Sequence, residues 1–354
     1  MKDFIKLIST LCITFVLSII ILFISSKIFM PKWIDHRMNM MTFIMKGFYA
    51  EPKDSLDVIF MGNSDTYRGI DPLVMYHEYG FTSYNFVAAG QRIWTGYSMF
   101  EESLKYQKPK IILFNADELF FTKQTSYGNS SKVYDNMPLS INKINSVFDP
   151  NYKRSRIVKL AHFLPIFRYH SRYNELTKDD LKYAFYNERY ALKGMDMVAY
   201  QEPYTGPKDY MKDTGEKMTL PDVSIYYLDK MIERCKQENI EFLLYHTPSP
   251  DSSSYARYIA VKEYADSKGI IYLELNNDNK KIGMDWNKDT SDGGDHLNLY
   301  GSEKVSKYLG KYLVDNYKLP DHRNEEKYNY WNDDYNTYLN EREKEINSEK
   351  NKSN

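Results

Sequence analysis

The feature that most constrains the fold of this chain is a regular alternation of short apolar runs with longer segments of helical periodicity. The runs are five or six residues long and rich in Ile, Leu, Val and Phe, as is typical of strands buried on both faces. One of the intervening segments opens with Pro221, a residue that suits the first turn of a helix. This rhythm predicts an α/β fold with a doubly wound parallel sheet. The predicted strands are 57–61, 83–88, 110–114, 240–245 and 270–274, and the predicted helices are 72–80, 93–107, 221–238 and 253–268.

A second feature is an uncharged run from Leu7 to Ser26. Its 20 residues match the roughly 20 that a helix needs to cross a bilayer, so we expect a membrane anchor. A cleaved signal peptide is the alternative, but the run is long for one and no small-residue cleavage pattern follows it. Basic residues lie on both sides of the run, so charge alone does not orient the anchor. The predicted organisation is a short N-terminal tail at 1–6, a transmembrane anchor at 7–28, a juxtamembrane segment at 29–54, an α/β domain at 55–318 with an insertion at about 120–220, and a polar C-terminal helix and tail at 319–354.

The composition excludes several classes of protein. Lys and Arg number 47 against 48 for Asp and Glu, a formal net charge of −1, so nothing favours a nucleic-acid partner. The 2 Cys exclude a disulfide scaffold and a Cys-rich zinc module. The histidines other than His296 show no paired spacing typical of a metal site, and no Gly-Lys-Ser/Thr phosphate loop is present. We therefore expect no metal, no cofactor and no nucleic acid.

Polar residues that directly follow the strands are candidate site residues, because parallel sheets bind ligands outside the carboxyl ends of their strands. Gly62 permits a sharp exit from the first strand, and Ser64 then falls where a helix would begin. Gly90 follows the second strand and Asn115 the third. If these strands are adjacent, the N–H groups of Ser64 and Gly90 and the amide of Asn115 can converge on a developing oxyanion.

A late loop supplies a candidate base for the Ser64 hydroxyl. It carries His296, with Asp292 four residues before it and Asp295 one residue before it. A serine becomes an effective nucleophile when a neutral histidine takes its proton and a carboxylate orients that histidine. Asp292 and Asp295 are both candidates for the orienting role, with a slight preference for Asp292 because a Gly-Gly turn lets it fold over the ring. Arg68 is a candidate for binding an anionic substrate, or for a salt bridge within its own helix.

These residues resemble the SGNH/GDSL hydrolases, and within them the membrane-anchored cell-envelope branch similar to DltD and the alginate O-acetylation proteins. The resemblance covers about residues 55 to 318. It implies a flavodoxin-like three-layer α/β/α sandwich, a Ser64 nucleophile, a His296 base, a helping Asp and an oxyanion donor at Gly90. The motifs that carry it are Gly62-Asn63-Ser64 after a strand, the trailing Arg68-Gly69-Ile70-x-Pro72, Gly90 after the next strand, and Asp295-His296-Leu297-Asn298 before Gly301 and a final helix.

Two positions depart from the pattern of that family. Its helping Asp normally precedes the His by three residues, and here Gly293 stands at that position. Its third block normally reads Gly-x-Asn-Asp, whereas this chain has Asn115 followed by Ala116. The oxyanion role of Asn115 and the choice between Asp292 and Asp295 therefore stay open.

Two regions lie outside the strand and helix rhythm. Residues 120–220 hold many of the 33 Tyr, and we expect a partly helical insertion over the carboxyl edge of the sheet, a lid whose tyrosines suit a glycan. After Pro320 the chain turns polar, and we expect disorder beyond about residue 345. A narrow apolar stripe before that point predicts a helix packed on the domain; it consists of Trp331, Tyr335, Tyr338 and Leu339.

Two functions fit the sequence. The first is a membrane-anchored extracytoplasmic serine acyltransferase or esterase that acts on acetyl or D-alanyl groups of a cell-wall polymer or exopolysaccharide. Its expected partners are that glycopolymer, the lipid bilayer around residues 7–28 and, by resemblance, a multipass membrane-bound O-acyltransferase. The alternative is a non-catalytic scaffold of the same fold that binds the polymer or the membrane O-acyltransferase.

Overall fold

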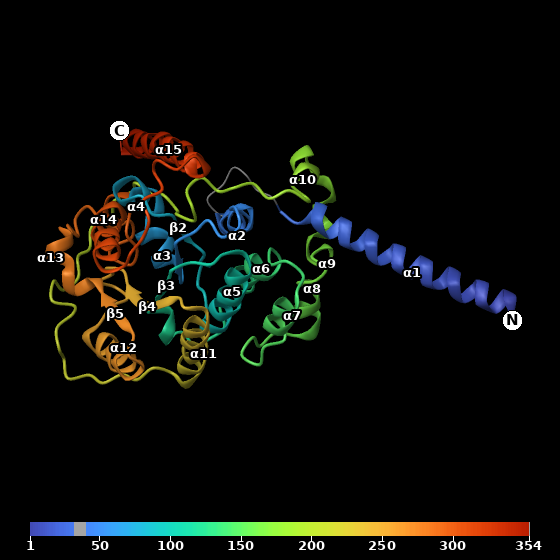
Figure 1. Cartoon of the computed structure of the whole chain (residues 1–354), viewed down its shortest axis with the longest axis horizontal. Coiled ribbons are helices and arrows are strands. Elements are labelled where there is room, and N and C mark those ends of the chain that lie inside the picture. The colour runs from blue at the N-terminus through green and yellow to red at the C-terminus, as the bar shows by residue number, and fades with distance from the viewer. Residues whose placement is uncertain (32–39, 354) are drawn as a thin grey trace.

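A five-stranded parallel sheet forms the centre of the molecule (Figure 1). The structure is a computed structural model that describes residues 1–31 and 40–353, so residues 32–39 of the predicted juxtamembrane segment lie outside it. The strand order β2-β1-β3-β4-β5 reverses between β1 and β3, which is the switch point of flavodoxin-like sheets. The predicted α/β fold with a parallel sheet is confirmed. The strands are β1 (Val58–Met61), β2 (Ser83–Asn85), β3 (Ile111–Asn115), β4 (Glu241–His246) and β5 (Ile271–Glu274).

Helices cover both faces of the sheet, which makes three layers. Successive side chains of a strand point to opposite faces, so Ile59 packs into one hydrophobic cluster and Phe60 into the other. Ile112 and Leu113 of the neighbouring strand divide in the same way, because β1 and β3 pair in register. The first face carries α5 (Ile93–Tyr106), α11 (Asp222–Glu238) and α12 (Tyr255–Lys268), and the second carries α4 (Pro72–Tyr79) and α14 (Leu299–Asn316), with the short α13 (Asn279–Ile282) beside α14.

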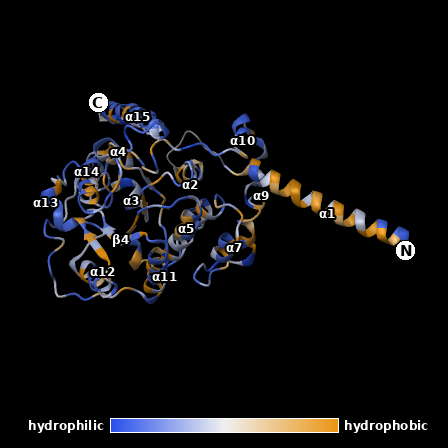
Figure 2. Ribbon diagram, in the orientation of Figure 1, coloured by the Kyte–Doolittle hydropathy of each residue, from blue (hydrophilic) through white to orange (hydrophobic). Residues whose placement is uncertain are grey.

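The N-terminal helix α1 (Lys2–Phe29) projects away from the domain (Figure 1). It is long and apolar enough to cross a membrane, and Figure 2 shows its ribbon coloured as hydrophobic along most of its length. Most of its large apolar side chains are exposed. Its last turn is attached to the domain: the Ile166 amide donates to Ser26 Oγ at 3.1 Å, and Arg172 Nη1 donates to the Phe29 carbonyl at 2.6 Å. The predicted anchor at 7–28 falls within α1, and α2 (Met40–Ala50) is the next helix that the structure describes.

The insertion at about 120–220 is partly helical, but most of it does not cover the carboxyl edge of the sheet. Helix α7 packs on α5, while α9 and α10 contact α1. The stretch 196–204 crosses the edge, where the Leu299 amide donates to the Val198 carbonyl at 2.8 Å, and Thr125 lies at the turn after β2, where a Cβ on Gly90 would be 2.9 Å from Thr125 Oγ1. The predicted lid is therefore wrong for α7, α9 and α10, which pack on α5 and α1, whereas Thr125 and the stretch 196–204 do reach the predicted edge. These helices are α6 (Tyr127–Tyr134), α7 (Ile141–Val147), α8 (Arg156–Ala161), α9 (Ile166–Tyr169) and α10 (Lys178–Lys182), with 3-10 turns η2 (Asp117–Phe120) and η3 (His170–Asn174).

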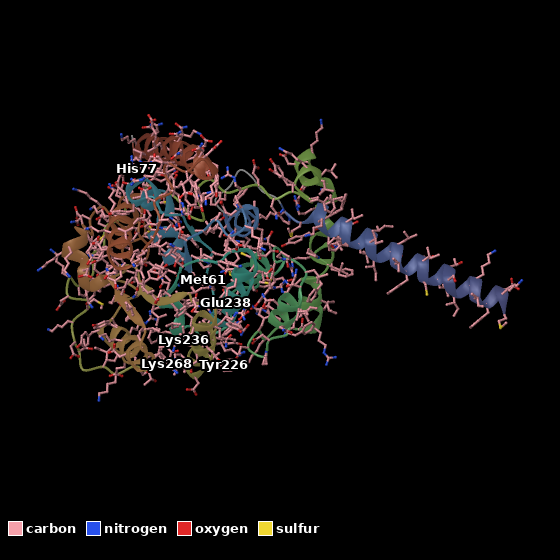
Figure 3. The ribbon with its side chains drawn as sticks, viewed as in Figure 1. Met61, His77, Tyr226, Lys236, Glu238 and Lys268 are labelled. Carbon is pink, nitrogen blue, oxygen red and sulfur yellow. The ribbon has the colours of Figure 1, made fainter. Side chains whose placement is uncertain are left out.

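The C-terminal helix α15 (Asn329–Ser353) packs on α4 through its apolar stripe. Trp331 and Tyr338 are buried, and Tyr335 stacks on His77 with ring centroids 4.3 Å apart. His77, which Figure 3 labels, is on α4. Trp331, Tyr335 and Tyr338 therefore pack as the sequence predicted, whereas Leu339, the fourth member of the stripe, is exposed. The predicted disorder beyond about residue 345 is wrong, because α15 continues to Ser353. Two further 3-10 turns complete the chain, η4 (Leu275–Asp278) and η5 (Glu326–Tyr328).

Candidate active site

Ser64 is the first residue of α3 (Ser64–Gly69), just beyond the carboxyl end of β1. The helix begins here because Asn63 caps it, its Oδ1 accepting a hydrogen bond from the Asp65 amide at 3.1 Å. Ser64 is half-buried. It therefore lies beside the β1/β3 switch point, where sheets of this order bind their ligands.

Two glycine turns shape the site. Gly62 has φ +148°, and a Cβ there would lie 2.5 Å from Thr66 Oγ1, so only glycine permits the sharp exit from β1. Gly294, after Asp292, has φ +110°, and a Cβ there would lie 2.6 Å from Tyr204 Cδ2. These turns bring α3 and the loop of Asp292 to the same edge of the sheet.

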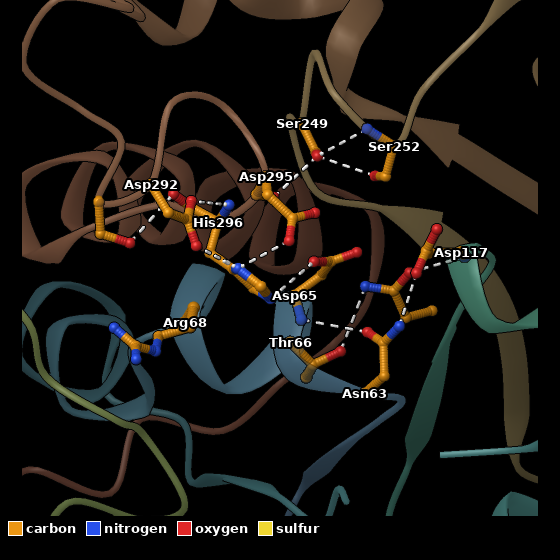
Figure 4. A network of polar contacts seen from close by, with 12 residues as sticks. Asn63, Asp65, Thr66, Arg68, Asp117, Ser249, Ser252, Asp292, Asp295 and His296 are labelled. Carbon is orange, nitrogen blue, oxygen red and sulfur yellow. Dashed lines mark hydrogen bonds and ion pairs between the residues drawn. The ribbon is translucent and has the colours of Figure 1, made fainter. Parts of the chain in front are cut away.

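His296 is held by the carboxylates on its own loop (Figure 4). Its Nδ1 lies 2.6 Å from Asp292 Oδ2 and 3.2 Å from Asp295 Oδ2. Its backbone amide also donates to Asp292 Oδ1 at 2.7 Å. Because Asp292 accepts hydrogen bonds from both the ring and the backbone of His296, it is the carboxylate better placed to orient the imidazole. The proton that its side chain accepts from the ring is the one on Nδ1.

The same carboxylates set the charge of the site. Burial alone would lower the pKa of His296, but the hydrogen bond to Asp292 and the charge of Asp295 raise it above its usual value. Burial would raise the pKa of Asp292, yet its hydrogen bonds from His296 lower it, so Asp292 is the ionised partner. Burial raises the pKa of Asp295.

The other ring nitrogen of His296 faces α3. Nε2 lies 3.7 Å from Oδ1 of Asp65, the neighbour of Ser64, and the structure records no hydrogen bond between Ser64 and His296 among the residues it describes. Burial and the charge of Asp117 raise the pKa of Asp65 well above its usual range. The structure thus brings the predicted base to the first turn of α3, where a catalytic hydrogen bond often tightens only when substrate is bound.

The candidate oxyanion donors are only partly available. Gly90 lies in the turn after β2, next to the carboxyl end of β1, with φ +55°. Asn115 is fully buried at the end of β3. Its Nδ2 donates to Thr66 Oγ1 at 3.2 Å and its Oδ1 accepts from the Asp117 amide at 2.9 Å. The side chain of Asn115 therefore links the end of β3 to α3, and an oxyanion role would require its Nδ2 to give up the hydrogen bond to Thr66 Oγ1.

Arg68 points away from its own helix. Its Nε lies 2.7 Å from Asp196 Oδ2, on the part of the insertion that crosses the carboxyl edge. The salt bridge of Arg68 is therefore not within its own helix, as that alternative predicted, but joins α3 to the insertion. Substrate binding by Arg68 stays a prediction.

Three further residues at this edge were not singled out from the sequence, namely Asp65, Asp117 and His246. Asp117 lies two residues beyond the end of β3, and His246 is the last residue of β4. Both are buried, and Arg257 Nη1 donates to Asp117 Oδ1 at 3.0 Å. The signal that would have found them is position, because a polar residue at the carboxyl end of every strand, β4 included, faces the same edge.

Comparisons with known proteins do not assign a family to the chain. No protein-family model matches it, and no curated protein matches it by sequence. Among solved structures it is similar to a proposed acylhydrolase from Bacteroides fragilis, at 13% identity and a TM-score of 0.37, over 80% of this chain and 99% of that chain. A likeness at this level carries no argument about the reaction, so the function rests on the geometry of the site.

Proposed function

We propose that the chain is a membrane-anchored serine acyltransferase or esterase that acts on O-acyl groups of an extracytoplasmic polymer through an acyl-enzyme on Ser64. The observation that carries the proposal is the orientation of His296. Asp292 accepts the Nδ1 proton, which leaves Nε2 free to act as a base toward the first turn of α3. A buried strand, a glycine exit and a serine at the start of a helix supply the nucleophile beside it.

The proposed reaction has two balanced steps. Ser64 Oγ attacks the acyl carbonyl while His296 Nε2 takes the hydroxyl proton, and the Asp292 carboxylate stabilises the resulting imidazolium. The donor oxygen then leaves with that proton, which gives a Ser64 ester. In the second step, His296 Nε2 removes a proton from water or from a polymer hydroxyl, whose oxygen attacks the carbonyl of the Ser64 ester. The bond between Ser64 Oγ and the acyl carbon then breaks, and His296 returns the proton to Ser64 Oγ. Water as acceptor makes the protein an esterase, and a polymer hydroxyl makes it a transferase.

Anchoring by α1 would hold this site near the membrane surface. By the resemblance described above, the acyl group would come from a multipass membrane-bound O-acyltransferase and the acceptor would be a cell-wall polymer or exopolysaccharide. Acetyl and D-alanyl esters are the two acyl groups to compare as substrates.

A fluorophosphonate probe on the full chain in nanodiscs tests the role of Ser64. We expect stoichiometric labelling that is lost in Ser64→Ala and retained in Ser252→Ala, a nearby serine whose hydroxyl donates to Ser249 Oγ at 2.8 Å. Labelling that persists in Ser64→Ala contradicts the proposal.

The second candidate function is a non-catalytic scaffold that binds polymer. Two observations favour it: no Ser64–His296 hydrogen bond is recorded in the described part of the chain, and the Asn115 amide is engaged by Thr66. Intact-mass spectrometry after incubation with acetyl and D-alanyl esters separates the two functions. An acyl adduct on Ser64 supports the enzyme, and polymer binding without any adduct supports the scaffold.

A further inference from the structure

Asp65, Asp117 and His246 form a buried cluster at the carboxyl ends of β1, β3 and β4, which we call the Asp65 cluster. One ligand atom from each residue lies within 4.8 Å of the others. Asp65 and Asp117 are each 4% exposed and His246 is 3% exposed. Two carboxylates this close in a buried setting repel each other, so they require a shared proton, a cation or a cationic side chain between them.

His246 is oriented in the manner of a metal ligand. Its Nδ1 lies 3.2 Å from Glu274 Oε2, so the Nδ1 proton is donated to that carboxylate. Its Nε2 is buried and has no hydrogen-bond partner among the described residues. Glu274 is itself held by the Tyr272 hydroxyl at 2.5 Å. A carboxylate on one ring nitrogen, with the other nitrogen left as a free lone pair, is the usual support of a histidine that binds a metal.

Asp65 supplies a second unpartnered atom. Its Oδ2 is buried without a hydrogen-bond partner within the described part of the chain. Asp117 is already fixed in place, because its Oδ2 accepts from Asn63 Nδ2 at 2.6 Å and its Oδ1 accepts from Arg257 Nη1 at 3.0 Å. The guanidinium of Arg257 bonds to Asp117, and among the described residues no donor reaches Asp65 Oδ2 or His246 Nε2.

We propose that Asp65, Asp117 and His246 bind a divalent transition-metal cation. One imidazole nitrogen with two carboxylate oxygens is a ligand set that Zn²⁺ accepts, and it leaves room for further ligands. The site goes beyond the proposed acyl chemistry. It also adjoins that chemistry, because Asp65 forms a second possible ligand group with Asp295 and His296, whose ligand atoms likewise lie within 4.8 Å of one another.

Zn²⁺ binding to the metal-stripped full chain tests this site. Isothermal titration with ZnCl₂ should give one equivalent per chain, and His246→Ala and Asp65→Asn should each weaken binding by tenfold or more. Glu274→Gln, which keeps the size of the side chain but removes the carboxylate that accepts from His246 Nδ1, should weaken it by about 10- to 100-fold. His296→Ala is the matched control and should retain binding, because it alters the second ligand group alone.

The outcomes separate the proposal from its alternatives. Loss of Zn²⁺ binding in His296→Ala with retention in His246→Ala would overturn it in favour of the other group. An absence of binding at millimolar Zn²⁺ would overturn it in favour of a proton shared by Asp65 and Asp117. If the His246 variant misfolds, the unfolding midpoint of the native chain is measured with and without Zn²⁺. A rise with Zn²⁺ that is smaller in Glu274→Gln supports the site, and the absence of any rise counts against it. Fluorophosphonate labelling of Ser64 in stripped protein reports the proposed acyl chemistry separately.

A different observation concerns the end of the domain nearest α1. Helices α7, α8 and α9 gather there (Figure 1) and carry large apolar side chains that are exposed to solvent. Helix α8 contacts α9, and α9 contacts α1. Exposed apolar side chains of this size usually mark a contact surface. The apolar face consists of Ile157 (76% exposed) and Leu160 (55%) on α8 and Phe167 (58%) on α9.

We further infer that the apolar face rests in the surface of the bilayer that α1 crosses. Continuity with α1 identifies the occupant, because the last turn of α1 bonds to Ile166 and Arg172 directly beside the face. Arg156, which is exposed on α8, would place a cation at the level of the lipid headgroups. This inference rests on the membrane anchoring in the proposed function.

Quenching by nitroxide lipids tests the contact. The full chain with Cys12→Ser and Ile157→Cys carries a bimane label in nanodiscs that contain anionic lipid, and we expect at least twofold quenching by lipids labelled near the headgroup. Lys280→Cys on α13, an exposed position far from α1 in Figure 1, is the control and should show none. The absence of lipid quenching at residue 157 overturns the inference. Shielding of the label from iodide without lipid quenching also overturns it, because a protein partner would produce that result. A label on native Cys12 reports insertion of α1 independently.

Discussion

In most proteins charged side chains are exposed and large apolar side chains are buried, and the Asp65 cluster and the apolar face depart from this rule in opposite ways. The first buries carboxylates and an imidazole, and the second exposes leucine, isoleucine and phenylalanine. Each arrangement costs free energy in the isolated chain. Both lie where the chain is proposed to meet something outside itself, a cation and an acyl substrate at one place and lipid at the other. The comparison teaches that such departures from the folding rules mark contact surfaces.

Two histidines show the same contrast within one residue type. His296 and His162 each place Nδ1 near an Asp carboxylate, at 2.6 Å from Asp292 and 2.7 Å from Asp135. His296 is partly exposed between two carboxylates, whereas His162 is fully buried beside the cation of Arg168. Similar pairs therefore serve a proposed reaction in one region and packing in the other.

The largest expected effect comes from breaking the Asp292–His296 pair. Asp292→Asn should lower kcat by about 10³-fold, because general-base catalysis contributes about 10² to 10⁴ and the ring loses the acceptor that sets its tautomer. Asp295→Asn, the matched control, should lower kcat by less than about tenfold, since Asp295 lies 3.2 Å from Nδ1 and does not bind the backbone. Acyl-ester turnover checks both, and equal losses would show that the two carboxylates share the role.

The next effect concerns the buried charge of the insertion. Asp135→Asn should lower the free energy of unfolding by about 3 kcal/mol, because it leaves Arg168 and His162 without their carboxylate in a buried setting. Asp209→Asn, at an exposed position, is the control and should change it by less than about 0.5 kcal/mol. Urea unfolding of the full chain in detergent measures both. If Asp135→Asn lowers the free energy of unfolding only slightly, then this region tolerates the buried charge of Arg168 without a paired carboxylate.

The pH dependence of stability should follow His162. Burial lowers the pKa of His162 below 6.5, against the opposing effect of Asp135 and with help from Arg168 and Lys143. As the pH falls through 6.5, His162 therefore takes up a proton in the unfolded chain before it does so in the folded chain. Its contribution to the free energy of unfolding is complete above pH 6.5 and is lost as the pH falls below that value, by at most about 1.4 kcal/mol per pH unit.

His162→Gln should remove that part of the slope. In metal-stripped protein, histidine NMR titration should place the midpoint of His296 above 6.5 and that of His162 below it. Midpoints in the reverse order would contradict the assignment of the two environments.

The smallest effect is expected on the apolar face. Ile157→Ser should change the free energy of unfolding in detergent by less than about 0.5 kcal/mol, because a side chain that is 76% exposed contributes little to the core. Ile59→Ser on β1, which is fully buried, should destabilise the chain by about 2 to 4 kcal/mol. A large loss from Ile157→Ser would show that this face packs against the chain itself.

The strands and the main helices were predictable because their signal is local. A strand buried on both faces needs only a short apolar run, and β1 to β5 fall within one residue of their predicted starts. Ser64 and His296 were predictable as candidates because each stands in a recognisable loop. Asp65 was overlooked because an acid in the first turn of a helix is common, and His246 because it had no neighbouring ligand in the sequence. The insertion was misplaced because length and tyrosine content do not say which surface its helices meet.

The sequence by itself determined the succession of strands and helices along the chain, the apolar N-terminal helix and the loops that carry the candidate nucleophile and base. These depend on local period and turn chemistry, which each segment specifies alone. Only the tertiary structure decided that Asp292 grips His296 more closely than Asp295, that Asn115 is engaged by Thr66, and that Asp65, Asp117 and His246 meet. Asp292 and His296 are four residues apart and meet through a loop that turns at Gly294, but the other contacts join segments far apart in the chain. Their distances follow from strand order and register, which bring the carboxyl ends of β1, β3 and β4 to one edge.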